Sequence, residues 1–178
     1  MQLKSKSIFL KLADVGDAEF ILNLRKSEKY NKYLSKTEGC LTEQINWLKN
    51  YKIRESLNEE YYFIIFRGAD NEKIGTVRLY DFKESPLSFC WGSWILNEKK
   101  TISSAIESAL LIYQFAFDCK GFEQSHFDVR NDNHKVIDFH KKLGAQEVSK
   151  NELNTYFTFS KNTYQRIYAS YSKFLEVK

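Results

Sequence analysis

Runs of apolar residues, some alternating and some continuous, divide the chain into short elements. Residues 7–13 alternate apolar and polar positions well enough for a strand, and 60–66 form a continuous apolar run typical of a buried strand. Apolar residues at helical spacing follow, for example Phe20, Ile21 and Leu24. The pattern predicts strands over 7–13, 60–66, 73–82, 87–96, 125–130, near 148 and over 155–159, and helices over about 14–29, from 42, and over 102–119, 133–143 and 163–174.

The order of these elements is βααβββαβαββ, followed by a C-terminal helix. This order predicts a mixed α/β (α+β) fold, with a mostly antiparallel central sheet flanked by helices and one central βαβ unit. No repeat or composition change divides the chain, so we expect one domain over 1–178. Gly68, Gly121 and Gly144 mark turns or helix ends, and residues 30–39 form a polar and aromatic connection.

Composition and charge limit the classes of ligand and the kinds of site that we expect. The net charge of +4 is scattered and includes no long basic run, so the charge pattern does not call for a nucleic-acid surface and is equally compatible with an anionic small molecule. We expect no nucleic-acid partner. No stretch approaches the roughly 20 apolar residues of a membrane span, and no signal peptide is visible, so a soluble cytoplasmic protein is expected. The three cysteines and three histidines lack the spacing of a disulfide framework or a metal site. Cys90 and Cys119 are therefore expected to be core residues.

Residues 94–110 predict a strand that passes through a short polar loop into a long helix. The first N–H groups of a helix lack partners within it, and they lie at the positive end of the helix dipole. Ser103, Ser104 and Ala105 are small enough to let a ligand approach the backbone there. This junction is thus a candidate seat for phosphate oxygens.

Two segments resemble the motifs of the GNAT superfamily of N-acetyltransferases. Residues 100–105 (KTISSA) occupy the place of the family's Arg/Gln-x-x-Gly-x-Gly/Ala motif, although Lys100 and Ser103 replace the leading residue and the glycine. Residues 133–145 match the spacing of the second motif, with Val136, His140 and Ala145 in place of Ser, Tyr and Phe. The order of the elements matches as well, so the resemblance covers essentially the whole chain.

The resemblance implies that acetyl-CoA binds where the strands over 87–96 and 125–130 separate. Backbone groups of 94–96 would bond the pantetheine arm, and N–H groups of 101–105 would hold the pyrophosphate. Asn133 would bond the arm or cap its own helix. Replacing the motif glycine is tolerable only if Ser103 can adopt the required backbone shape. The implied cofactor-binding residues are Trp94, Ile95, Leu96, Lys100, Thr101, Ile102, Ser103, Ser104, Ala105, Asn133, Phe139 and His140.

The implied chemistry is direct transfer of the acetyl group to a neutral amine. The family commonly uses a tyrosine to protonate the departing thiolate, and His140 stands at that position. An imidazole with an ordinary pKa of about 6.5 can donate a proton, which makes His140 a candidate acid. Asp81 and Asp128, with His126 beside them, are candidates for the general base. A helix surface position for His140 stays open.

The acceptor would be recognised by the first two helices and the facing strands. Arginine suits phosphate and aromatic rings stack on bases and sugars, so these residues favour a nucleotide-sugar, unless they are ordinary packing. The terminal tyrosines are expected in the core or at a dimer face, which leaves a homodimer open. The candidate acceptor residues are Arg25, Tyr33, Trp47, Arg78, Tyr80 and Trp91.

The sequence is therefore expected to encode an acetyl-CoA-dependent N-acetyltransferase. Its residues are similar to those of the branches that act on surface-polysaccharide amino-sugars and on ribosomal proteins, and a nucleotide-linked amino-sugar is the favoured acceptor. A protein or peptide N-terminus is the alternative acceptor. A non-catalytic binding module with this fold is the third hypothesis, because the motif glycine is replaced.

Overall fold

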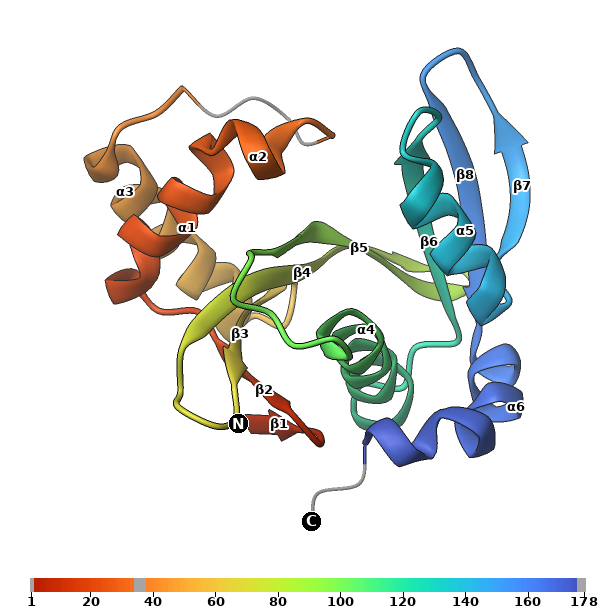
Figure 1. Ribbon diagram of the computed structural model, residues 1–178. Coiled ribbons are helices and arrows are strands. Elements are labelled where there is room, and N and C mark those ends of the chain that lie inside the picture. Colours follow the sequence, from red (N-terminus) through yellow and green to blue (C-terminus); the bar gives the residue numbers. More distant parts are fainter. Residues whose placement is uncertain (1, 34–37, 176–178) are drawn as a thin grey trace.

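One eight-stranded sheet forms the centre of the molecule. The computed structural model describes residues 2–33 and 38–175, and the strand order is β1-β2-β3-β4-β5-β6-β8-β7 (Figure 1). Adjacent strands are antiparallel except β5 and β6, which run parallel, so the predicted mostly antiparallel sheet is confirmed. The strands are β1 (Gln2–Lys4), β2 (Ile8–Leu12), β3 (Tyr61–Arg67), β4 (Lys73–Glu84), β5 (Leu87–Leu96), β6 (Gln124–Arg130), β7 (Gln146–Lys150) and β8 (Asn154–Ser160).

Helices cover both faces of this sheet (Figure 1). Helices α1 and α3 pack on one face, and α4 lies against the other. Helices α5 and α6 lie beside the β6–β8 half of the sheet. The helices are α1 (Ala18–Lys26), α2 (Glu28–Asn31), α3 (Leu41–Ser56), α4 (Ser104–Gln114), α5 (His134–Leu143) and α6 (Lys161–Tyr171), with short helical turns at Val15–Asp17, Phe115–Cys119 and Ser172–Phe174.

The sequence of β3 explains why helices are needed on both sides. Successive side chains of a strand point to opposite faces, and here both sets are apolar. Tyr62 and Ile64 pack with α1 and α3, whereas Tyr61, Phe63 and Ile65 belong to the core beneath α4. All five are buried. The continuous apolar run thus reflects a strand covered on both faces.

The long helix predicted over 102–119 differs from expectation at both ends. It begins at Ser104, and its final turn, Phe115–Cys119, is a π-helix. Its apolar residues pack as expected, with Leu110 and Ile112 fully buried. Cys119, expected in the core, is exposed, because the widened last turn carries it to the surface. Cys90 is buried as predicted.

The other differences between the predicted and the observed elements lie mainly in the N-terminal third of the chain. Strand β1 was not predicted, and it pairs with β2 to form a hairpin at the edge of the sheet. The first helix ends at Lys26, and the short α2 follows where a polar connection was expected. Residues 34–37 of that connection lie outside the described part of the chain. Gly144 ends α5 with φ +98, the left-handed conformation predicted for a helix cap.

The parallel pair β5–β6 separates after a short contact. Only Ser88↔Gln124 and Phe89↔Ser125 are in register, although both strands continue well beyond these pairs. The register of β4 and β5 also shifts between Thr76 and Arg78, and Ser93 has φ +46. Bulges bend a strand and re-aim its side chains. The sheet therefore opens into a wedge along the C-terminal half of β5.

Within the described residues, no helix combines the length and apolarity needed to cross a membrane. The same residues contain no group of three or more metal-ligating side chains placed to hold a metal ion.

Candidate active site

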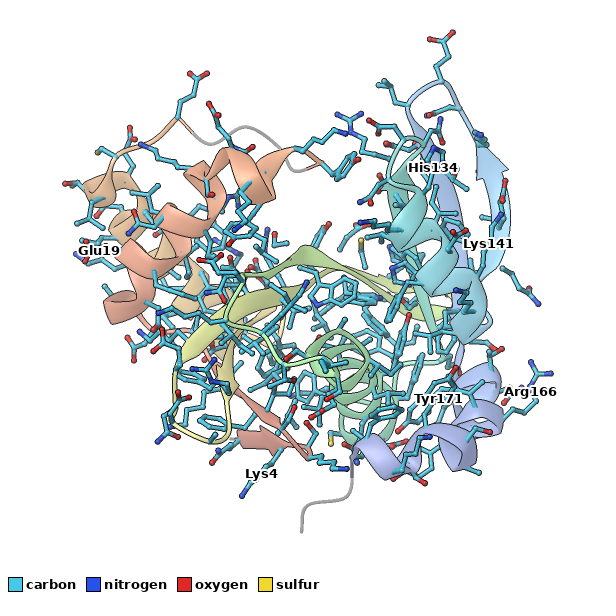
Figure 2. The ribbon with its side chains drawn as sticks, viewed as in Figure 1. Lys4, Glu19, His134, Lys141, Arg166 and Tyr171 are labelled. Carbon is cyan, nitrogen blue, oxygen red and sulfur yellow. The ribbon has the colours of Figure 1, made fainter. Side chains whose placement is uncertain are left out.

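A cavity of about 690 Å³ fills the wedge between β5 and β6. Its walls come from β5, β6 and α5, and Tyr30 and Tyr33 stand at its mouth. Figure 2 shows His134 at the end of α5 that faces α2 across this region. Several predicted cofactor residues line the cavity, namely Trp94, Ile95, Leu96, Lys100, Asn133 and His140.

Aromatic rings build the floor of this wedge. The Trp94 indole N–H donates to Ser108 Oγ on α4 at 3.0 Å, and Phe139 packs on the same indole at 5.2 Å between ring centroids. Trp91 is buried and donates to the Tyr113 hydroxyl at 3.3 Å. Trp91 therefore lies on the α4 side of the sheet, beside Trp94, and on the opposite face from Arg78 and Tyr80. The structure thus does not group it with these two predicted acceptor residues.

The loop between β5 and α4 adopts an ordinary helical start. Ser103 has φ −94 and ψ −4, so no glycine is required at this position. The Ser104 hydroxyl accepts from Thr101 N at 2.9 Å, and the Ile102 side chain is fully exposed. The loop residues Thr101 to Ala105 therefore keep the strand–loop–helix geometry despite the substitution of the motif glycine.

Two polar side chains of the wedge have atoms available to a ligand. Asn133 precedes α5, but over the described residues its side chain makes no capping bond. Asn154, at the start of β8, has a buried Oδ1 without a hydrogen-bond partner in the described structure. Both residues line the cavity. The sequence analysis missed Asn154, because only the pairing of β8 with β6 brings it to this site.

His140 is buried in an aromatic cage. Its side chain is 3% exposed, and the rings of Trp91, Phe127 and Phe139 lie 4.3–5.4 Å from its centroid. Burial lowers the pKa of His140 to about 3, so the ring is neutral at neutral pH. A neutral ring can donate one N–H hydrogen bond, so the proposed role of His140 as an acid stays a prediction. The alternative, a position on the helix surface, is wrong, because the side chain is buried. Its Nδ1 has no partner among the described residues.

A second cavity, of about 770 Å³, is lined by residues of the C-terminal end of α3, of β3 and of β4, together with Lys120 and Phe122, which follow the π-helical turn. Its buried polar group is Glu60, which is 3% exposed. Glu60 accepts from Arg54 Nε at 2.8 Å and also from Arg78 Nε. Both guanidinium groups contact the ring of Trp47, and that of Arg78 lies 4.8 Å from the Tyr80 ring. Three predicted acceptor residues, Trp47, Arg78 and Tyr80, thus form one cluster.

The two cavities meet at Tyr80. A Cβ placed on Gly92 would lie 3.0 Å from the Tyr80 hydroxyl. Gly92 lines the wedge, and Tyr80 lines the second cavity. Burial raises the pKa of Tyr80, so its phenol remains a neutral hydrogen-bond donor. The absence of a side chain at Gly92 thus lets the Tyr80 ring pack closely against β5, between the two cavities.

The remaining predicted acceptor residues lie elsewhere. Arg25 lines a smaller cavity of about 250 Å³ between α1 and α3, together with Trp47. The Tyr33 hydroxyl donates to the Asp132 carbonyl at 3.3 Å, across the mouth of the wedge. The structure therefore does not place Arg25 or Tyr33 in the cavity of Arg78 and Tyr80.

A hydrogen-bonded chain connects the candidate base Asp81 to the sheet. His126 Nε2 lies 3.0 Å from Asp81 Oδ2, and His126 Nδ1 lies 2.9 Å from the buried Ser88 hydroxyl. Since an ionised carboxylate only accepts, we assign the Nε2–H tautomer, with Nδ1 accepting from Ser88. The bond from His126 lowers the pKa of Asp81. Asp128, the other candidate, is exposed and lines the wedge.

Comparisons with known proteins agree with this geometry. The sequence model of the acetyltransferase (GNAT) domain matches residues 8–146. A probable N-acetyltransferase of Bacillus subtilis (strain 168), YjcK, is 26% identical over 121 residues, which cover 65% of this chain and 67% of that protein.

Solved structures extend the similarity. One described as apo FdhC, a nucleotide-linked sugar GNAT, is 52% identical, has a TM-score of 0.93 and covers 99% of both chains. The spermidine N-acetyltransferase of Vibrio cholerae, in complex with CoA and spermine, is 18% identical with a TM-score of 0.74. It covers 89% of this chain and 98% of that one, so it shows the shared fold only.

Proposed function

Since the chain belongs to the GNAT acetyltransferase family and takes its acetyl group from acetyl-CoA, we propose that the acceptor is the primary amine of a nucleotide-linked amino-sugar. The observation that carries this proposal is the similarity, over nearly the full length of both chains, to a nucleotide-linked sugar GNAT. The clustered arginines of the second cavity support the same class of acceptor.

The wedge is the proposed site of acetyl-CoA. His140 Nδ1 and Asn154 Oδ1 are buried there without partners, and such atoms are costly unless a ligand supplies the missing bonds. The pantetheine arm carries amides that can both donate and accept. The main chain of Trp94, Ile95 and Leu96 would bond this arm, because β6 has separated from β5 at that point.

The start of α4 is the proposed pyrophosphate seat. Ile102, Ser103 and Ala105 would offer N–H groups at the positive end of the helix dipole. The N–H groups of Thr101 and Ser104 already donate to Ser104 Oγ and to the Thr101 carbonyl, so these two residues would shape the loop. Other polar and aromatic contacts would come from Lys100, Asn133 and Phe139.

The second cavity is the proposed site of the acceptor. Glu60 holds both Arg54 and Arg78 through their Nε atoms, and over the described residues no bond is made by their terminal nitrogens. Each guanidinium therefore keeps an edge with which to grip a phosphate, and a fixed guanidinium loses little freedom on binding. Trp47 supports the two arginines, and Tyr80 offers its hydroxyl where the cavities meet.

The proposed base is Asp128. It lines the same cavity as Trp94 and His140, so it lies near the place where the amine must meet the thioester. Asp81 lines the second cavity, and its lowered pKa keeps it ionised, which suits attraction of a protonated amine. When bound, acetyl-CoA supplies the electrophilic thioester. His140, being neutral, would contribute a single N–H donor and an apolar wall that excludes water.

The test is thiol release from acetyl-CoA with four acceptors: a thymidine- or uridine-diphosphate amino-sugar, the same amino-sugar without the nucleotide, spermidine and a peptide with a free N-terminus. We expect turnover with the nucleotide-sugar and little with the free amino-sugar that lacks the nucleotide. Faster turnover of the peptide would favour the alternative acceptor. Binding of CoA with no turnover of any acceptor would favour a non-catalytic module.

Matched variants sharpen this test. Arg78→Ala should raise KM for the nucleotide-sugar about tenfold, because one charge-assisted phosphate contact is lost, while KM for acetyl-CoA stays constant. Asp128→Asn should instead lower kcat with little change in either KM. An unchanged kcat in Asp128→Asn would remove Asp128 from the mechanism.

A further inference from the structure

The least expected polar group in the molecule is Glu107, one turn inside α4. Its side chain is fully buried, and within the described residues no cation pairs with it. A buried carboxylate without a counter-ion is costly unless hydrogen bonds replace the lost water. The packing of the apolar helix α4 does not explain why a glutamate occupies this position.

Neutral donors from the N-terminal hairpin surround this carboxylate. Ser5 Oγ donates to Glu107 Oε2 at 2.6 Å, and Ser7 N donates to the same oxygen at 2.8 Å. Ser7 Oγ donates to Oε1 at 2.7 Å. Burial alone would raise the pKa of Glu107, but bonds from Ser103, Ser5 and Ser7 outweigh it, and the pKa is lowered. The side chain is therefore an anion held by hydroxyl and amide groups.

The same hydroxyls continue into the proposed pyrophosphate seat. Ser7 Oγ lies 2.8 Å from Thr101 Oγ1 and 3.4 Å from Ser103 Oγ. Thr101 Oγ1 in turn lies 2.8 Å from Ser104 Oγ, which also accepts from Thr101 N. A continuous network thus runs from Glu107 through Ser7 to three residues of the loop.

We propose that Glu107 is a positioning residue for acetyl-CoA, which fixes the loop Thr101–Ser104 against the turn between β1 and β2 and so holds the phosphate-binding N–H groups in place. The loop lacks the family's glycine, and its shape is set instead by this network. The inference rests on the proposed cofactor site, because it assumes that this loop meets the pyrophosphate.

An effect of charge and an effect of loop positioning would change the CoA affinity of Glu107→Gln in opposite directions, so the two can be distinguished. Glu107 is negative, as is the pyrophosphate, so its charge alone should weaken CoA binding. If Glu107 acted only through charge, Glu107→Gln would tighten CoA binding. If it positions the loop, Glu107→Gln should weaken CoA binding about tenfold, since an amide NH₂ cannot accept the bonds that one carboxylate oxygen accepts.

The experiment is calorimetric titration of CoA into the wild type and folded variants, with steady-state kinetics on the same samples. Glu107→Gln and Ser7→Ala should each raise Kd for CoA and KM for acetyl-CoA about tenfold, with kcat changed less than about twofold. Ser7→Thr, which keeps the hydroxyl, should restore most of the affinity. Tyr164→Phe is the control, because it removes the partly buried bond from Tyr164 on α6 to Asp118 in the π-helical turn, which is not part of this network, and should leave Kd unchanged.

Each outcome decides one question. If Glu107→Gln does not fold, Ser7→Ala decides alone, because it keeps the carboxylate. Unchanged or tighter CoA binding in folded variants would overturn the positioning role. A Ser103→Asp variant tests the proposed pyrophosphate site separately from the positioning role of Glu107. If the wild type binds CoA and Ser103→Asp does not, the pyrophosphate site is supported, independently of the result for Glu107→Gln. If Ser103→Asp binds normally, the seat itself is wrong.

Discussion

Two buried glutamates, one on each side of the sheet, are stabilised in different ways. Glu60 accepts from two guanidinium groups, so its cluster carries a net positive charge and leaves arginine edges facing a cavity. Over the described residues, Glu107 accepts from serine hydroxyls and a backbone N–H but from no cation, so its cluster stays negative. The first arrangement suits an anionic ligand, and the second suits a loop whose shape must be kept. Both carboxylates are buried, so burial alone does not distinguish their roles, whereas the groups that hydrogen-bond to them do.

The largest effect is expected from removing Glu60. Glu60→Ala leaves two partly buried guanidinium groups close together without their counter-ion, which should lower the free energy of unfolding by about 3 kcal/mol. Urea denaturation at pH 7 measures this. Glu60→Gln is the control, because it keeps the shape and an acceptor oxygen, and it should lose less. Equal stability of Glu60→Ala and wild type would show that the arginines do not need the carboxylate.

Removing the charge of Glu107 should have a smaller effect, of about 2 kcal/mol, because its partners are neutral groups. The pKa of Glu107 is lowered in the folded state, so its contribution is present above the unfolded pKa and is lost as pH falls through the folded pKa. The stability difference between wild type and Glu107→Gln should thus shrink as pH falls below about 4.5. Urea midpoints from pH 7 to 3 test this, and a difference that grows on acidification would contradict it.

His140 provides a third case, a buried titratable group that stays neutral. Its folded pKa of about 3 lies below its ordinary value, so the unfolded chain binds a proton first as pH falls. Stability should therefore fall by about 1.4 kcal/mol per pH unit from about pH 6.5 downward. His140→Phe should lack this slope between pH 6.5 and 5 while matching wild type at pH 7.5. A slope that persists in the variant would exclude His140 as its source.

The smallest effect is expected at an exposed carboxylate. Glu98 pairs with Lys29 at 3.5 Å, and both side chains are mostly in solvent. Such pairs contribute little, because water and salt screen them. Glu98→Gln should leave the urea midpoint unchanged within error and change only its dependence on salt. A loss of stability as large as that of Glu107→Gln would remove the distinction between buried and exposed carboxylates drawn above.

The sequence was sufficient for most of the fold. Periodicity identified β2 to β6, β8 and the main helices, because each of these elements carries its apolar pattern in contiguous residues. It missed β1, whose three residues are too few to show alternation. The π turn at Phe115–Cys119 was also invisible, since its side chains continue the apolar pattern of α4.

The candidate site was harder to predict, because its groups come from distant segments. Trp94 and Asn133 could be placed by motif spacing, but nothing local links Ser7 to Glu107, 100 residues away. That Trp91 lies on the opposite face from Arg78 and Tyr80 follows from the pairing of β5 with β4, which local periodicity does not give. The pKa of His140 depends on rings from β5, β6 and α5 that meet only after folding.

The short paired stretch between β5 and β6 also affects the stability of the folded protein when no ligand is bound. Between β5 and β6, two residue pairs are in register over the described residues, so this boundary is a place where local opening should begin. A ligand that binds the folded state adds RT ln(1 + [L]/Kd), about 2.7 kcal/mol at a hundred times Kd. With acetyl-CoA in the wedge, the supply of donor would govern the lifetime of the folded chain as well as its rate of catalysis.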